Sequence, residues 1–165
     1  MFREMRRKAQ QLPQEEAIEI LKTRTHGILA TSGDDDYPYA VPLSYLYEDG
    51  KIWFHCAMEG HKLDAIRQNP KVSFCVVAED HVVPEKLTTF YKSVIAFGKA
   101  RILEGEEKRR SVVSLARRYA PEASQESIDR EIDDSWPRLC MVEIAIEHLT
   151  GKECMELTKK RKSEK

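Results

Sequence analysis

A glycine followed by two basic residues, Gly60, His61 and Lys62, joins a strand-like run to a helix-like run within WFHCAMEGHKLDAI. Cations are disfavoured in the first turn of a helix, because its free backbone N–H groups carry partial positive charge. The same N–H groups favour an anion. A phosphate or pyrophosphate bound by the helix N-terminus and Lys62 would resolve the conflict. The alternative is that both basic side chains project into water, at a cost of about 0.3–1 kcal/mol each.

His55 and Cys56 precede this motif and suggest two other kinds of chemistry. With His61 they could be metal ligands, but adjacent residues of a strand point to opposite faces, so His55 and Cys56 cannot face one ion. A closed zinc site would also need four ligands from one direction. A catalytic thiolate at Cys56 would need a His–Asp or His–Asn partner pattern, which the sequence lacks. We therefore predict no metal site and assign no catalytic residue.

The run TTFYKSVIAFG places Phe90, Tyr91 and Phe97 among hydroxyl-bearing and basic residues. Its alternation fits a strand whose aromatic side chains face the core. It also fits an aromatic wall with hydroxyl donors, suited to a planar heteroaromatic ligand. Taken alone, the pattern favours the core role.

The first half of the chain contains the elements that position these residues. LPQEEAIEILKTR predicts a helix, and GHKLDAIRQNP predicts a short one that ends at Asn69 and Pro70. Four runs predict short strands: HGILATS, YAVPLSYLY, KIWFHCA and KVSFCVVA. The turn signals GDDDYP and YEDGK separate the first three, which we expect to pair as an antiparallel meander.

The second half adds two strands and two helices. After a predicted loop, EDHVVPEK, the run LTTFYKSVIAFGKARILE predicts the longest strand, with a bulge or bend at Gly98. GEEKRRSVVSLARRYAP predicts a helix with Val112, Val113, Leu115 and Ala116 facing inward, SQESIDREID a second helix, and LCMVEIAIEHL the last strand. Six mostly sequential strands predict a mainly β protein, a six-stranded antiparallel barrel with peripheral helices. We expect one domain over residues 1–155 and a charged, disordered tail over 156–165.

Bulk composition argues against several classes of function. The 165 residues suit one compact domain, and a formal net charge of −1 gives no basic field for nucleic acid. No apolar run approaches the ~20 residues of a membrane span. The start, MFREMRRKAQQL, lacks the apolar core of a signal peptide, and the four cysteines form no C-x-x-C pair. We expect a cytoplasmic protein without nucleic-acid or membrane partners.

Taken in order, four stretches resemble the FMN-binding split-barrel family: LPQEEAIEIL, the run from GILATS to FCVV, TTFYKSVIAFGKARIL, and HLTGKE. More narrowly, they resemble its pyridoxamine 5'-phosphate oxidase-related branch, which includes the nitroimidazole-resistance proteins. The resemblance covers roughly Met5 to Glu153, and its most specific part is YPYAVPL followed by FHCA and GHK. It implies a six-stranded split barrel that forms a homodimer, with one FMN in each of two clefts between the subunits.

The resemblance also assigns residues to the cofactor. His61 and Lys62 match the basic pair that holds the FMN phosphate, and Ser93 matches a polar contact on the long strand that could come from the partner subunit. Val41, Pro42 and Ala57 are expected to allow close approach of the backbone. The implied cofactor-binding residues are Tyr39, Val41, Pro42, Leu43, Ser44, His55, Cys56, Ala57, His61, Lys62 and Ser93.

Two departures from the sequence pattern of this family narrow the activity that the resemblance implies. The oxidases that make pyridoxal phosphate carry a basic motif on the second strand, where this chain has YAVPLS. They also end in a substrate motif containing Arg, His and Trp, where this chain has TGKECMELTKKRKSEK, so we do not expect that oxidase activity. The resemblance implies an FMN-dependent oxidoreductase acting on a small planar electron acceptor, as a nitroreductase does. The alternatives are a non-catalytic flavin- or haem-binding protein, with His55 and His148 as haem ligands, and a structural dimer with an empty cleft.

Overall fold

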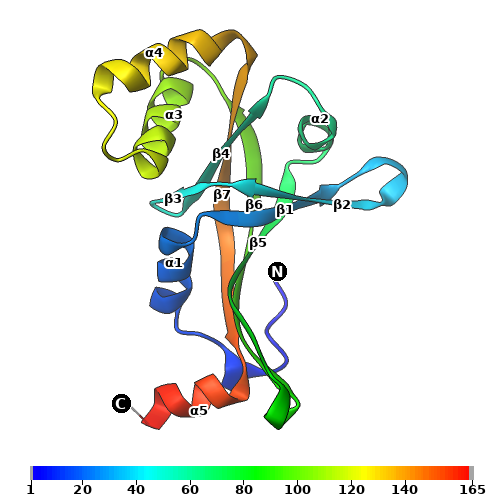
Figure 1. The fold of residues 1–165 in the computed structure, drawn as a ribbon. Helices are drawn as coiled ribbons and strands as arrows, with labels where there is room; N and C mark the ends of the chain where they lie inside the picture. The colour runs from blue at the N-terminus through cyan, green and yellow to red at the C-terminus, as the bar shows by residue number, and fades with distance from the viewer. Residues whose placement is uncertain (1, 164–165) are drawn as a thin grey trace.

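A computed structural model describes residues 2–163, in which one curled antiparallel sheet carries helices at its periphery (Figure 1). The sheet has seven strands in the order β2-β1-β5-β6-β7-β4-β3. The strands are β1 (His26–Ser32), β2 (Pro38–Ser44), β3 (Leu46–Glu48), β4 (Lys51–Ala57), β5 (Lys71–Val83), β6 (Thr88–Leu103) and β7 (Leu139–Glu153). The helices are α1 (Gln14–Thr23), α2 (His61–Gln68), α3 (Gly105–Tyr119), α4 (Gln125–Ser135) and α5 (Met155–Ser163). The prediction of a mainly β fold is confirmed.

The predicted second strand accounts for the difference between six expected strands and the seven found in residues 2–163. It divides at Tyr45 into β2 and β3, which lie at the two opposite edges of the sheet. The Tyr45 side chain is fully buried, and its hydroxyl donates a hydrogen bond to the Leu21 carbonyl at 2.9 Å. Because one residue joins the two edges, the chain itself closes the sheet into a split barrel.

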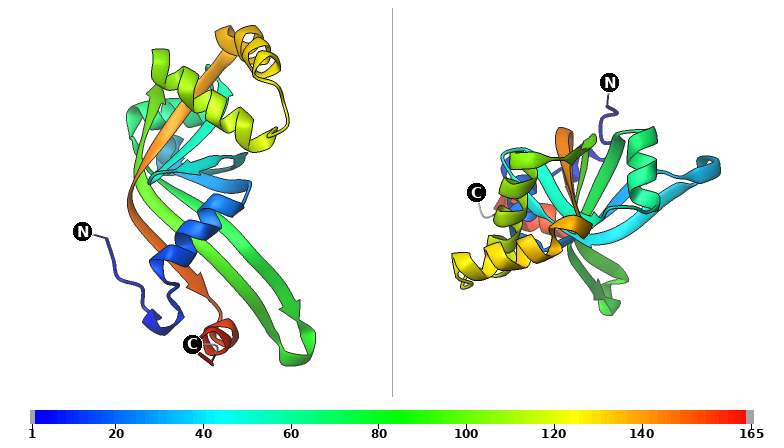
Figure 2. Two further views of the ribbon diagram at one scale, coloured as in Figure 1. Left: turned by 90° about the vertical axis from the view of Figure 1, so that its left-hand side faces the viewer. Right: turned by 90° about the horizontal axis from the view of Figure 1, so that it is seen from above.

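The ribbon formed by β5 and β6 is longer than predicted. We expected a loop over residues 79–86, but β5 continues to Val83 and only the 3-10 turn Pro84–Lys86 separates it from β6. The two strands remain paired as far as Val83 and Thr88 and project beyond the rest of the sheet (Figure 2). The pairing shifts register between Val77 and Glu79 and then continues through the predicted loop, where His81 pairs with Phe90.

The bulge predicted at Gly98 is confirmed. The pairing of β6 with β7 shifts register between Phe97 and Gly98, which bends the long strand around the barrel. A Cβ atom at Gly98 would lie 2.2 Å from the Ala145 carbonyl oxygen, so the backbones of β6 and β7 approach closely here.

The predicted helices are present, and the C-terminal segment is ordered beyond expectation. The structure has helix α5 where we predicted a disordered tail from residue 156. Arg161 binds the fully buried Glu153 through two contacts, Nε to Oε1 at 2.9 Å and an Nη2–Oε1 distance of 2.7 Å. This ion pair fastens α5 to the end of β7. Residues 164 and 165 lie outside the described residues.

Two apolar clusters support the fold. The larger fills the barrel interior and includes Leu29, Phe54, Phe74 and Val94. The smaller lies between the α3–α4 pair and the sheet and consists of Trp53, Leu103, Val112, Leu115, Ile128, Ile132, Leu139 and Met141. The inward face predicted for α3 therefore packs on this second cluster. Across residues 2–163, none of the helices combines the length and apolar character needed to cross a membrane.

Candidate functional site

Two strand segments with unpaired edges flank the predicted cofactor site. β2 is an edge strand that pairs only with β1. β4 pairs with β7 along its length, but β3 covers its other side only from Lys51 to Trp53. The second half of β4, from Phe54 to Ala57, therefore also has a free edge. The two segments diverge from β3, and α2 lies between their far ends (Figure 1). Their backbone N–H and C=O groups remain available to a ligand.

The side chains of these segments alternate between two environments. Tyr39, Val41 and Leu43 are half-buried on β2, whereas Pro42 and Ser44 are exposed. On β4, Cys56 is half-buried while His55 and Ala57 are exposed. His55 and Cys56 therefore point to opposite faces, as their adjacent positions predicted. The β2 and β4 residues of the predicted set therefore lie on the two strand segments whose edges are unpaired.

The N-terminus of α2 lies beside the start of β2, where His61 contacts Tyr39, and has no side-chain cap. Gly60 is the N-cap residue with φ +130°, a conformation that favours glycine, and a Cβ there would meet no atom within 4 Å. The Gly60 carbonyl accepts hydrogen bonds from the backbone N–H groups of Leu63 and Asp64 at 2.9 and 3.2 Å. The backbone N–H groups of His61 and Lys62 make no hydrogen bond within residues 2–163, so they remain available to an anion, the kind of ligand that helix N-termini bind.

The basic pair of α2 has two different environments. The His61 ring stacks on Tyr39 with centroids 4.1 Å apart, and its Nε2 atom lies 3.8 Å from Oδ2 of the largely exposed Asp34. Asp34, in the turn between β1 and β2, therefore supplies part of the negative charge that the sequence predicts near the N-terminus of this helix. Lys62 is half-buried, and within residues 2–163 none of the ion pairs involves it. Lys62 remains a cation that an anionic group could pair with.

Cys56 is placed for packing rather than nucleophilic chemistry. It lies directly across from Cys140 on β7, and both thiols are free. Burial, followed by the neighbouring Cys140, raises the pKa of the Cys56 thiol to about 12. A nucleophilic cysteine needs the opposite shift, because the thiolate is the reactive form.

Ser93 is separated from the other predicted cofactor residues. It lines a cavity of about 500 Å³ on the outer side of β6 and β7, together with Phe97 and His148. The Phe2 ring covers part of this face and stacks on His148 with centroids 4.7 Å apart. None of the other predicted cofactor residues lines this cavity. Within one chain, Ser93 is therefore separate from the predicted cofactor residues on β2, β4 and α2.

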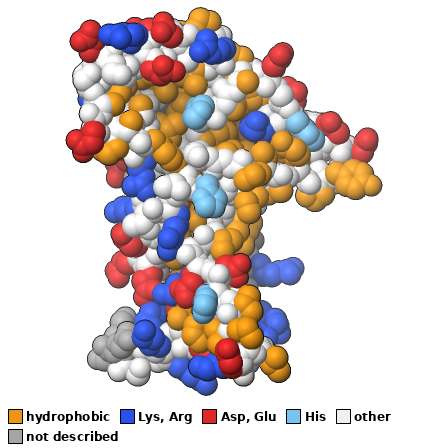
Figure 3. Space-filling view, in the orientation of Figure 1, with side chains coloured by type: hydrophobic (Ala, Val, Ile, Leu, Met, Phe, Trp, Pro, Cys, Tyr) orange, Lys and Arg blue, Asp and Glu red, His pale blue; other side chains and the backbone are white. Residues whose placement is uncertain are grey.

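A second cavity, of about 600 Å³, joins the predicted site to residues that the sequence did not indicate. Ser44, His55, Cys56 and Ala57 line one side. The other side is lined by Val112, Leu115, Ala116, Tyr119, Glu131, Ile132, Ser135, Arg138 and Leu139. Hydrophobic side chains reach the surface between the α3–α4 pair and the strands (Figure 3). The amphipathic pattern of α3 correctly predicted its inward face, but such a pattern does not distinguish packing on a core from lining a cavity.

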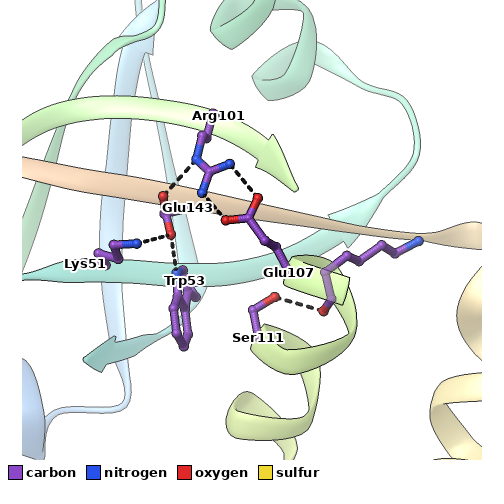
Figure 4. A network of polar contacts seen from close by, with 7 residues as sticks. Lys51, Trp53, Arg101, Glu107, Ser111 and Glu143 are labelled. Carbon is purple, nitrogen blue, oxygen red and sulfur yellow. Dashed lines mark hydrogen bonds and ion pairs between the residues drawn. The ribbon is translucent and has the colours of Figure 1, made fainter. Parts of the chain in front are cut away.

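A buried carboxylate on β7 fixes α3 over this cavity (Figure 4). Glu143 accepts hydrogen bonds from Trp53 Nε1 at 3.1 Å and Arg101 Nε at 2.8 Å, and Lys51 Nζ lies 3.0 Å away. Arg101 also donates two hydrogen bonds of 2.8 Å to Glu107 on α3. Burial by itself would raise the pKa of Glu143, but the contacts with Arg101, Lys51 and Trp53 outweigh it, so the pKa is lowered.

Comparison with known proteins places these features in a family context. The sequence model of a family described as pyridoxamine 5'-phosphate oxidase matches residues 13–153. No match was found among functionally curated proteins.

Several solved structures have the same fold. A conserved hypothetical protein from Mycobacterium tuberculosis is 24% identical, with a TM-score of 0.78 over 93% of this chain and 92% of that chain. An FAD-binding protein from Mesorhizobium loti is 26% identical, with a TM-score of 0.63 over 87% of this chain and 94% of that one. A candidate 5-nitroimidazole antibiotic resistance protein from Bacteroides thetaiotaomicron is 19% identical, with a TM-score of 0.72 over 87% and 86%.

Proposed function

Because the chain belongs to the pyridoxamine 5'-phosphate oxidase family, we propose that it is an FMN-binding oxidoreductase that reduces a small planar electron acceptor. The observation that carries the proposal is the uncapped N-terminus of α2 with the unpaired Lys62, beside the free edges of β2 and β4. The flavin-binding relative from Mesorhizobium loti supports a flavin ligand for this fold.

The residues present fit a flavin mononucleotide. The α2 N-terminus and Lys62 would hold its phosphate, since backbone N–H groups and a cation converge there. The free backbone edges of β2 and of β4 from Phe54 to Ala57 offer donors and acceptors for the polar part of the ring. Bound flavin would supply the redox chemistry, while the chain positions it and controls access to it.

We propose that the acceptor is closer to a nitroreductase substrate than to pyridoxamine phosphate. The β2 residues from Tyr39 to Ser44 carry no charge, so this strand offers no cation to a second phosphate. His55 is exposed at the 600 Å³ cavity, where its ring nitrogens can form hydrogen bonds with a ligand.

We also propose that two copies of the chain form a dimer through the outer face of the barrel. Ile28, Val77 and Ile95 are 38%, 51% and 38% exposed on the strands of this face. Monomeric proteins seldom leave contiguous apolar strand faces open. Ser93 lies on the same face, so a partner subunit would bring its own Ser93 toward a site that is incomplete in one chain. All four cysteines are free, as in a reducing compartment, which supports a cytoplasmic location.

An absorption spectrum of the purified protein tests the cofactor. We expect a yellow protein whose flavin band persists through desalting and whose released cofactor is FMN. We then expect a nicotinamide donor to bleach the band and an added nitroarene or quinone to restore it. Colourless protein that ignores added FMN would overturn the flavin proposal. A flavin band that no donor bleaches would support flavin binding but overturn the proposed oxidoreductase activity.

A further inference from the structure

We propose that the 600 Å³ cavity between the α3–α4 pair and β4 is the acceptor-binding chamber and that it selects uncharged ring compounds, such as quinones, over phosphorylated ones. This inference rests on the proposed function, because it names the substrate class of the same site. It draws on the size of the cavity, the side chains that line it, their charges and their rigidity.

The volume and the lining suit a small apolar ring compound. Sites for small organic ligands commonly enclose about 300–1,000 Å³ and are mostly apolar with a few polar groups. Here α3 contributes Val112, Leu115 and Ala116, and Ile132 of α4 and Leu139 of β7 complete the apolar wall. Val112, Leu115, Ile132 and Leu139 are almost fully buried and belong to the packed cluster beneath the cavity.

The charged groups of the cavity do not form a phosphate site. Arg138 is the one arginine among the lining residues, which include no lysine, and its guanidinium already donates to the Asp134 carbonyl at 3.1 Å. Glu131 supplies an opposing negative charge. A phosphate monoester carries about two negative charges at neutral pH, and its binding sites supply several cations or N–H groups. The cavity therefore disfavours a phosphate and tolerates an uncharged ligand with one or two hydrogen-bond acceptors.

The walls of the cavity are held in place by hydrogen bonds. The Tyr119 hydroxyl, at the end of α3, donates to the Tyr45 carbonyl at 2.9 Å and accepts from the Tyr45 N–H at 3.1 Å. At the other end of α3, Glu107 is tied through Arg101 to the buried Glu143. A chamber fixed at both ends is preformed, so a ligand would bind without ordering the helix first.

The cavity also shares residues with the proposed flavin site. Ser44 ends β2, and the segment from His55 to Ala57 belongs to the free edge of β4. A ring in the cavity would therefore lie against the same two strand ends that flank the flavin. This contiguity is what an acceptor needs in order to receive electrons.

Equilibrium dialysis of the protein as purified, with menadione and with pyridoxal 5'-phosphate as separate probes, tests the proposal. We expect saturable menadione binding and at least tenfold weaker binding of pyridoxal 5'-phosphate. Ala116→Trp fills the chamber from α3 and Ser135→Trp fills it from α4, and each should weaken menadione at least tenfold. Ala120→Trp places the same side chain at an exposed position after α3 and should change menadione binding less than twofold.

The flavin content of each variant, measured by absorbance, separates the two proposals. Variants that keep wild-type flavin but lose menadione support the chamber. Unchanged menadione binding in both Ala116→Trp and Ser135→Trp, or phosphate-ester binding as tight as menadione binding, would overturn it. If the wild-type protein holds no flavin yet binds menadione in an Ala116-dependent way, the flavin proposal fails and the chamber stands. Thermal unfolding identifies any variant that has failed to fold. If Ala116→Trp or Ser135→Trp does not fold, menadione binding by the other of the two tests the proposal.

Discussion

At the residue scale, groups of both charges lie at the N-terminus of α2. Lys62 forms no ion pair within residues 2–163, while His61 lies between Tyr39 and Asp34. The positive end of the helix adds to the charge of Lys62. A phosphate would be attracted by Lys62 and by the backbone N–H groups but repelled by Asp34. Lys62 should therefore raise the affinity for the cofactor, and Asp34 should lower it.

Replacing Lys62 by alanine should weaken FMN far more than it weakens folding. A charge-assisted contact contributes about 1.5–3 kcal/mol, which corresponds to roughly a ten- to hundredfold increase in the dissociation constant. Flavin fluorescence titration measures the change, and riboflavin, which lacks the phosphate, should be almost unaffected. Arg67→Ala is the matched control, because Arg67 lies on the same helix but pairs with Asp64 at 3.0 Å. Equal losses for riboflavin and FMN would show that Lys62 does not hold the phosphate.

Removing the charge of Asp34 should have the opposite effect. Asp34→Asn takes away a carboxylate 3.8 Å from His61 Nε2 and frees His61 to face an anion. Because Asp34 is mostly exposed, the gain in FMN affinity should be modest, about two- to fivefold, and should shrink at high salt. The same titration at low and high salt measures it, with Asp35→Asn on the same turn as control. A loss of affinity in Asp34→Asn would place the phosphate elsewhere.

At the element scale, the Glu143 cluster joins three strands and a helix. It connects β4 through Lys51 and Trp53, β6 through Arg101, and α3 through Glu107. Glu143 itself is 4% exposed, so removing its charge would leave the Trp53 N–H and Arg101 with poorer partners in a buried setting. The position of α3, and with it one wall of the cavity, depends on this carboxylate.

Glu143→Gln should therefore lower the free energy of unfolding by about 2–4 kcal/mol. Urea denaturation at neutral pH measures the loss. Glu107→Gln is the control: its carboxylate accepts hydrogen bonds from the same arginine but is half-exposed, so a much smaller loss is expected. Equal losses in the two variants would mean that burial does not determine the strength of the cluster.

The lowered pKa of Glu143 also predicts a pH dependence of stability. The unfolded glutamate titrates near pH 4.3, above the folded value, so at intermediate pH the unfolded state binds the proton more readily. The stabilisation is full above the unfolded pKa and is lost as pH falls through the folded pKa. Unfolding free energies of wild type and Glu143→Gln, measured from pH 7 to pH 3, should converge at the acid end. A constant difference across that range would contradict the assignment.

The elements show where sequence patterns suffice and where they do not. The α2 boundaries followed from Gly60 and Asn69-Pro70, and the Gly98 bulge from a glycine inside a long β run, because these signals are local. The division of the second predicted strand at Tyr45 could not be predicted from local sequence, because YAVPLSYLY alternates as one strand. Only the contacts of Tyr45 with α1 and α3 place the two parts of this segment, β2 and β3, at opposite edges of the sheet. Residues 79–83 of the loop expected at 79–86 are strand, because pairing with β6 outweighs their turn-like sequence, and residues 84–86 form a turn.

The candidate site could be predicted in part. The Gly60 motif and the family resemblance predict His61, Lys62 and residues of β2 and β4, and the structure places them on the N-terminus of α2 and on the two strand segments with unpaired edges. The α3 and α4 walls of the cavity were missed, because Leu115 or Tyr119 carries no chemical signature. Ser93 remains a prediction that depends on the partner subunit.

At the scale of the whole molecule, the outer barrel face predicts the oligomeric state. We expect a dimer in sedimentation equilibrium at micromolar concentration, with a total buried area near 2,000 Å². Ile95→Glu, at a partly exposed position on this face, should yield monomers with reduced flavin content. Met155→Glu, similarly exposed on α5, should leave the dimer intact. A monomeric wild type with full flavin occupancy would contradict both the interface and the role of Ser93.

The pairing of β4 with β7 has a consequence for how the protein is made. Trp53 and Glu143 are 90 positions apart, so one side of β4 has no partner until β7 has left the ribosome. Closing so long a loop is slow, and barrels dominated by distant pairings fold slowly. We therefore expect the first half of the chain to leave the ribosome as an incomplete sheet with an unpaired, aggregation-prone strand edge. Chaperone dependence during synthesis, rather than the stability of the finished barrel, should then limit its yield in the cell.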